Sequence, residues 1–285
     1  MVVLIAVAGM VALTGAGSLG AASVHSAQSR TTRPDVVILL TDQQRADAFG
    51  AVSADELRTP VMDRLANEGV LFTRAFAATP QCSPSRVALL TGLYPHRTGV
   101  MGNTAEEAAA AKAGLSAGMS TALDRSLPTV GKVFAAAGYQ TAYFGKWHLG
   151  GTPGDYGFES HDSTVRDGDL ARRVVDVLQK RRADGARRSL LLIVSWLNPH
   201  DIYGVLSTAP SPPRALSSAR LPANLTDDLR AKPFPQRHYL DEDQGKPFVG
   251  AAPDMWRRYR AFYNGLVETV DREIGAVLDA MKGDN

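Results

Sequence analysis

The chain alternates short runs of apolar residues with helical patterns along most of its length. The segments 36–40 and 190–196 are almost continuously apolar, which is typical of strands buried on both faces. The segments 169–182 and 254–281 carry apolar residues at helical spacing. Strands of this kind need helices on each side to cover them. The sequence therefore predicts an α/β fold with a mostly parallel central sheet between helical layers.

Further elements are predicted from apolar patterns and from residues that begin or end helices. Thr59 and Pro60 are residue types that begin helices, and Gly69 is a type that ends them. The same reasoning predicts helices at 60–68, 83–90 and 128–137, and strands at 70–76 and 139–144.

The composition is that of a globular protein. The chain has 285 residues, of which 45% are hydrophobic and 21% are charged, and its net charge is +2. These values fit one large domain or two small ones, and they exclude disordered, collagen-like and coiled-coil chains. The arginines form scattered pairs without a continuous basic tract, so nucleic acid is not expected as a partner.

An apolar run at residues 2–13 is followed by small residues. It is shorter than the ~20 residues of a membrane span and is similar to the apolar region of a signal peptide. We predict that residues 1–29 are a signal peptide or anchor with a spacer, so that the protein is exported: secreted, periplasmic or membrane-anchored. If the run is instead a buried segment of the mature fold, a cytoplasmic location is expected.

Two segments are predicted to be irregular. Residues 198–253 are rich in proline and lack periodicity, and we interpret them as a long loop on the substrate side, with a passive linker as the alternative. Residues 104–122 are rich in Ala and Gly and predict a surface insertion.

The only cysteine, Cys82, begins the segment Cys-Ser-Pro-Ser-Arg. Pro84 favours a first helical turn, which puts Cys82 at a helix N-terminus, where free N–H groups attract anions. Arg86 follows one turn later and could neutralise charge on the same anion. The segment thus predicts a nucleophile that meets a tetrahedral anion, and a buried structural cysteine is the alternative.

Polar residues also follow the first predicted strand. Asp42 and Gln43 lie at its carboxyl end, the edge at which parallel sheets bind ligands. Carboxylate and amide oxygens are the ligands that Ca²⁺ and Mg²⁺ prefer. This strand end is therefore a candidate metal site.

Candidate acid–base residues follow two later strands. Lys146 and His148 come after the strand at 139–144, and in extended backbone they would point to one face and offer a cation and a proton donor. His200 follows the strand at 190–196, so a histidine stands at this strand end as well.

Together these segments resemble a known family. The pattern Cys-x-Pro-x-Arg at 82–86, with Thr-Gly at 91–92, is similar to the signature of the type I sulfatases, and Gly-Lys-Trp-His-Leu-Gly at 145–150 supports the resemblance. It spans about residues 34–281. It implies an alkaline-phosphatase-like fold, in which residues 30–285 are the N-terminal portion of a catalytic domain whose C-terminal part is missing.

The resemblance implies that a formylglycine-generating enzyme converts Cys82 into formylglycine, the catalytic aldehyde. The hydrated aldehyde, activated by a divalent ion at Asp42 and Gln43, would attack the sulfur of a sulfate ester. Residue 82 itself would thus contact the metal. The ion would be Ca²⁺ or Mg²⁺, and the substrate a sulfated small molecule or glycan.

The same resemblance gives roles to four more residues. Lys146 and Arg86 would hold the charge of the sulfate, and His148 would contact the aldehyde hydrate. His200 would protonate the leaving oxygen.

Two alternatives stay open. The resemblance implies that Gln43 stands where many sulfatases have a second Asp, a substitution also found in related sulfatases and in phosphonate monoesterases. A phosphonate or phosphate ester hydrolase on the same scaffold is therefore possible. Complete sulfatases also carry Asp-His or Asp-Asn on a strand after a helix like 254–281, and the Asp-Asn pair at 284–285 follows no such strand. The second alternative is therefore a truncated, inactive fragment.

Overall fold

The computed structural model describes residues 3–8, 33–52, 57–104, 122–185, 188–204, 220–242 and 245–282. The chain forms two compact units. The first unit contains Thr41–Ala75 and Trp196–Ala276, and the second contains Val3–Leu40, Phe76–Ser195 and Val277–Asn285.

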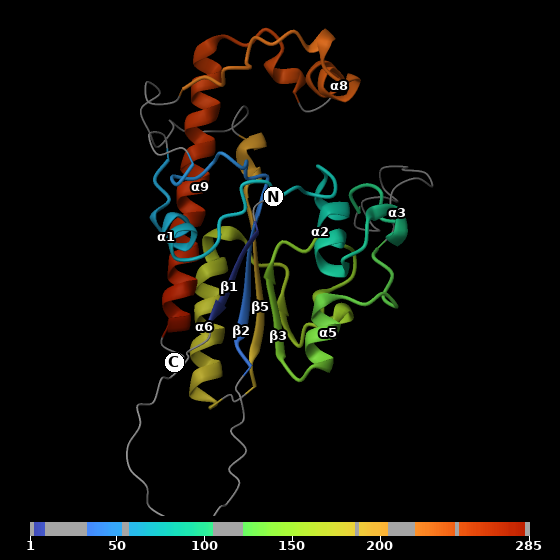
Figure 1. Cartoon of the computed structure of the whole chain (residues 1–285), viewed down its shortest axis with the longest axis vertical. Helices are drawn as coiled ribbons and strands as arrows, with labels where there is room; N and C mark the ends of the chain where they lie inside the picture. Colours follow the sequence, from blue (N-terminus) through green and yellow to red (C-terminus); the bar gives the residue numbers. More distant parts are fainter. Residues whose placement is uncertain are drawn as a thin grey trace, which may run out of the picture. The chain divides into compact units, whose positions relative to one another are not determined.

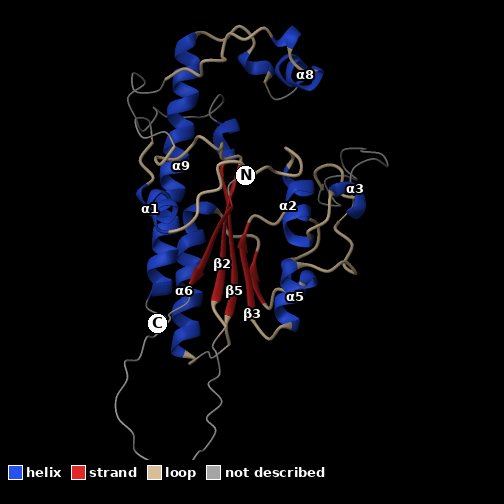
Figure 2. Cartoon of the chain, viewed as in Figure 1, coloured by secondary structure: helices blue, strands red, loops and turns tan. Residues whose placement is uncertain are grey.

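A five-stranded sheet has the order β1-β2-β5-β3-β4 (Figures 1 and 2). Strand β3 is parallel to both β5 and β4, with Gln140 opposite Leu190, whereas β1 is antiparallel to β2. The strands are β1 Val3–Ala8, β2 Asp35–Asp42, β3 Gln140–Gly145, β4 Ser160–Asp162 and β5 Leu190–Pro199.

Helices of the second unit cover both faces of this sheet (Figure 1). Helices α2 and α5 lie on one face, and α6 lies on the other, where Arg173 stacks over the ring of Phe144. Successive β5 residues from Leu190 to Val194 are at most 2% exposed, which confirms a strand buried on both faces. The helices are α1 Pro60–Glu68, α2 Cys82–Thr91, α3 Pro95–Thr98, α5 Val130–Ala136, α6 Leu170–Ala183, α8 Phe234–Glu242 and α9 Pro253–Lys282, and the 3₁₀ turns are Pro153–Tyr156, Asp167–Asp169, His200–Gly204, Leu229–Ala231 and Lys246–Phe248.

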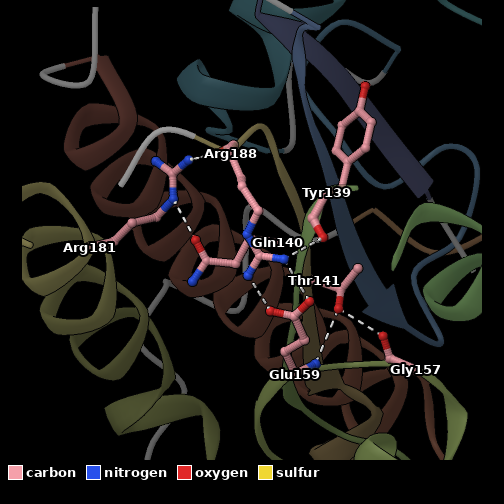
Figure 3. Close-up of polar contacts among 7 residues, drawn as sticks. All are labelled: Tyr139, Gln140, Thr141, Gly157, Glu159, Arg181 and Arg188. Atoms are coloured by element: carbon pink, nitrogen blue, oxygen red, sulfur yellow. Dashed lines mark hydrogen bonds and ion pairs between the residues drawn. The ribbon is translucent and has the colours of Figure 1, made fainter. Parts of the chain in front are cut away.

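Polar contacts fix the beginning of β3 (Figure 3). Arg188 donates to both carboxylate oxygens of Glu159, at 2.9 and 2.5 Å. The Thr141 hydroxyl donates to the Gly157 carbonyl at 2.7 Å and accepts from the Glu159 N–H. These contacts join β3 to the segment that leads into β4, and so hold the register of the sheet edge.

Most predicted elements are confirmed with small shifts at their ends. The helix predicted at 128–137 begins only at Val130, because the Thr129 hydroxyl accepts from the Lys132 N–H and caps it. Part of the segment predicted as a long loop forms α8 and 3₁₀ turns, whereas residues 205–219 lie outside the described residues.

The strand predicted at 70–76 was wrong. This segment is not a strand in the structure, and its side chains are exposed, with Val70 at 79%, Phe72 at 76% and Phe76 at 90%. An apolar, β-prone sequence becomes a strand only when another strand completes its ladder of hydrogen bonds. No such partner for this segment occurs in the part of the chain that the structure describes.

The N-terminal predictions are only partly within the described residues. Residues 3–8 of the apolar run form β1, whereas residues 9–32 and the interior of the predicted insertion, 105–121, lie outside them. Among the described helices, none is both long and apolar enough to cross a membrane. Export of the protein stays a prediction.

The first unit is organised around α1 and α9. Thr59 occupies the N-cap position of α1, but its hydroxyl donates to Asp63 and does not cap the helix. The cap comes from α9, where the fully buried Asp271 carboxylate accepts from the N–H groups of Val61 and Met62 at 3.2 and 2.8 Å. This cap spans about 210 residues of sequence, so the local pattern could not predict it.

We expect Asp271→Ala to lower the free energy of unfolding by about 2 kcal/mol, because two helix N–H groups lose their acceptor. Asp271→Asn keeps one acceptor and should cost less. Burial raises the pKa of the Asp271 carboxyl above its ordinary value. The folded state therefore binds this proton more tightly than the unfolded state does.

It follows that the stability contributed at Asp271 is lost as the pH rises from the ordinary carboxyl pKa to the raised one. Urea unfolding of the wild type and of Asp271→Asn across this pH range measures the difference between their free energies of unfolding. If the wild type gained stability relative to Asp271→Asn as the pH rises, the raised pKa of Asp271 would be contradicted.

Candidate active site

In the second unit, Cys82 is the first residue of α2 and its side chain is partly exposed. The Lys146 ammonium donates a hydrogen bond to the Cys82 sulfur at 3.6 Å. A cation thus lies beside the side chain at position 82, at the N-terminal end of a ten-residue helix. Both features favour negative charge at this point.

The end of β3 places Lys146 by a close approach of two strands. The preceding residue, Gly145, has φ +92°, and a Cβ there would lie 2.1 Å from the Ser195 carbonyl oxygen. The Lys146 N–H donates to that same oxygen at 2.8 Å. Glycine is therefore required at 145 for Lys146 to leave the sheet where it does.

Arg86 is 2% exposed and supports the same strand end. Its Nη1 donates to the Lys146 carbonyl and to the Ser195 hydroxyl, both at 2.8 Å, and lies 3.4 Å from the Tyr143 hydroxyl. The Tyr143 hydroxyl donates to the Lys146 carbonyl at 2.6 Å. Arg86 thus fixes the backbone of Lys146, and its predicted contact with a bound anion stays a prediction.

His148 has a left-handed backbone, with φ +60°. The expectation of extended backbone from Lys146 to His148 was wrong, because β3 ends at Gly145. The His148 carbonyl accepts from the hydroxyls of Ser83 at 2.7 Å and Thr104 at 2.9 Å. These two hydroxyls tie the loop after β3 to the beginning of α2.

The first unit contains the other predicted residues. Asp42 ends β2 and is 7% exposed, and His200 follows β5. A carboxylate oxygen of Asp42 and a ring nitrogen of His200 lie within 4.8 Å of each other. The His200 ring packs edge-on against Tyr203, whose hydroxyl is 2.9 Å from that of Tyr239 on α8.

Gln43 follows Asp42 and has φ +63°. Among the described residues, Gln43 and His148 are the two non-glycine residues with positive φ. Such conformations are uncommon and cluster at functional sites. Both positions were predicted from sequence as site residues, on unrelated grounds.

The donors at this turn fit a hard divalent ion in kind. Asp42 supplies a buried carboxylate at a strand end, and Gln43 supplies an amide oxygen next to it. Oxygen ligands of these types suit Ca²⁺ and Mg²⁺.

A family comparison decides what kind of protein carries these residues. The model of the sulfatase family matches residues 34–285, which is most of the chain. The chain belongs to the sulfatase family. The chain is 40% identical over 128 residues to the ulvan-active sulfatase of Formosa agariphila, and the match covers 44% of this chain and 21% of that protein.

Two further comparisons extend over more of the chain. It is 25% identical over 284 residues to the delta 4,5-hexuronate-2-O-sulfatase of Bacteroides thetaiotaomicron, covering 92% of this chain and 56% of that protein. The solved structure of a 2-O GAG sulfatase has a TM-score of 0.71 and 24% identity, and the match covers 86% of this chain and 53% of that one. The chain thus spans about half the length of these relatives, and the expected alkaline-phosphatase-like fold is confirmed.

The structure groups the predicted site residues in two sets. Cys82, Arg86, Lys146 and His148 lie in the second unit, whereas Asp42, Gln43 and His200 lie in the first. The sequence interpretation missed the hydroxyl-bearing residues that contact these sets. Ser83 lies inside the recognised motif, but Thr104 and Tyr263 belong to segments without any motif and have no comparable signal.

Proposed function

We propose that the protein is a sulfatase that hydrolyses a sulfate ester, with formylglycine made from Cys82 and a Ca²⁺ or Mg²⁺ ion. This proposal rests on one contact in a member of the sulfatase family. The Lys146 ammonium donates a hydrogen bond to the sulfur of Cys82, the first residue of α2, at 3.6 Å. The Cys82 sulfur occupies the position at which formylglycine would carry its oxygens.

Two groups would supply the chemistry of the reaction. The hydrated formylglycine would supply an oxygen nucleophile, and the divalent ion would lower the pKa of that oxygen. Asp42 and Gln43 would hold the ion. A formylglycine-generating enzyme would be needed during maturation.

The residues of the chain have separate tasks in this proposal. Lys146 holds the negative charge of the sulfate beside position 82. Arg86 keeps the Lys146 backbone in place through the 2.8 Å contact to its carbonyl and adds a buried positive charge one turn beyond position 82. His148 contacts the nucleophile, with its backbone held by Ser83 and Thr104.

The departing alcohol needs a proton, and His200 is proposed to donate it from a ring nitrogen to the leaving oxygen. The edge-on contact with Tyr203 limits how far the imidazole can rotate. Tyr203 is in turn joined to Tyr239 of α8. His200 itself lies at the beginning of the segment 198–253, which is predicted to form the substrate side, and this supports the proposed role.

We propose a sulfated glycan or a sulfated small molecule as the substrate, and an exported location. The relatives named above are sulfatases of ulvan, of a hexuronate and of a glycosaminoglycan, which favours a glycan. The apolar run at residues 2–13 is the basis for export.

Rates on matched esters test the reaction class. We expect the complete natural protein to hydrolyse an aryl sulfate about 100-fold or more faster, in kcat/KM, than the corresponding aryl phosphonate or phosphate diester. The fold does not separate these activities, because they share the scaffold. A faster rate on the phosphonate would support the alternative hydrolase, and no rate on any ester would support an inactive fragment.

A further inference from the structure

The turn after β2 has a conformation that glutamine rarely adopts. Gln43 has φ +63°, a region in which the side chain of any residue other than glycine crowds the backbone. Such a residue keeps this conformation only when the surrounding contacts hold it. The contacts on Gln43 therefore determine the shape of the turn that is proposed to bind the metal.

One side chain contacts the backbone on both sides of this turn. The Tyr263 hydroxyl donates to the Gln43 carbonyl at 2.8 Å and accepts from the Arg45 N–H at 2.7 Å. A single oxygen thus bridges residues 43 and 45, and it comes from α9, more than 200 residues later in the sequence.

The bridging hydroxyl is fixed in place by its surroundings. Tyr263 is 8% exposed and belongs to the core of the first unit, together with Ala48, Ile202 and Val267. Its ring therefore cannot swing away from the turn without opening that core. The next residue, Gln44, is held separately, since its Nε2 donates to the Ala48 carbonyl at 2.8 Å.

We propose that Tyr263 is a positioning residue for the metal-binding turn, whose hydroxyl holds Gln43 in its left-handed conformation so that Asp42 and Gln43 present their oxygens together. This inference rests on the proposed function, which makes these two residues metal ligands. Without the hydroxyl, the Gln43 carbonyl loses this donor and the residue can relax to ordinary backbone angles. The binding of the ion would then have to restore the turn, and its affinity would fall.

The chain offers a matched control on the same helix. Tyr259 lies one turn before Tyr263 and packs against the same core. The centres of the Tyr259 and Phe248 rings are 4.8 Å apart. Within the residues that the structure describes, its hydroxyl makes no hydrogen bond. Tyr263→Phe and Tyr259→Phe each remove one hydroxyl from α9, but only the first removes a contact to the turn.

The experiment measures Ca²⁺ and Mg²⁺ binding to the complete natural protein after metal removal, by titration calorimetry. We expect Tyr263→Phe to weaken binding of the native ion about 10-fold or more, as for other residues that orient metal ligands. Tyr259→Phe should bind as the wild type does. In turnover of an aryl sulfate, the metal concentration for half-maximal rate should rise in Tyr263→Phe, while KM for the ester at saturating metal is unchanged.

Wild-type affinity in Tyr263→Phe, or an equal loss in Tyr259→Phe, would overturn the inference. A wild-type protein that binds neither ion would instead overturn the proposed function, so the two failures are distinguishable. Melting of the metal-free proteins checks that each variant is folded. If Tyr263→Phe does not fold, Tyr263→Met is a second variant without the hydroxyl, to be judged by the same titration.

Discussion

Replacing Cys82 with alanine is expected to reduce kcat/KM for sulfate ester hydrolysis by about 10⁴-fold or more, because the side chain that becomes the nucleophile is lost. Position 82 lies at the beginning of α2, beside the Lys146 ammonium, and the described chain offers no second cysteine. Rates on an aryl sulfate, measured for the complete natural protein and its variant, test this expectation.

The control for Cys82→Ala is the folded state. The side chain is small and partly exposed, so its removal should leave the melting temperature of the protein nearly unchanged. A folded variant that keeps the wild-type rate would contradict the role of residue 82.

Replacing Lys146 with methionine is expected to reduce kcat/KM by about 100- to 1,000-fold, because the cation beside position 82 no longer stabilises charge on the sulfate. Methionine keeps much of the side-chain volume and removes the charge. Lys146→Arg should recover part of the rate, since it restores the charge with different geometry.

Lys132→Met is the matched control for Lys146→Met. Lys132 of α5 also lies in the second unit, but its ammonium contacts the carbonyl of Leu127, which precedes the helix, and not the side chain of residue 82. We expect its rate to be close to the wild-type rate. Similar losses in the two methionine variants would show that the effect is not specific to the site.

The sequence predicted those parts of the fold that depend on local pattern. The helix at 60–68 was correct at both ends, and α6 and α9 were correct to within one residue, because amphipathic spacing and helix ends are encoded locally. The segment at 70–76 was predicted as a strand and is not one, because pairing with a distant strand leaves no trace in the local pattern.

The candidate site shows the same division between local and distant information. The residue types and their positions after strands could be recognised, since motifs and strand ends are local. The left-handed backbone of Gln43 and His148 could not, because it is held by hydroxyls from other segments of the chain. The cap on α1 from Asp271 is a third contact of this kind.

Residue 82 is proposed to be a catalytic aldehyde derived from cysteine. Tandem mass spectrometry of the peptide that spans residue 82, from protein isolated from its natural source, tests it most directly. We predict formylglycine at this position, recognisable by its mass and by its reaction with a hydrazine probe. An unmodified cysteine thiol throughout the isolated, active protein would contradict this role of residue 82.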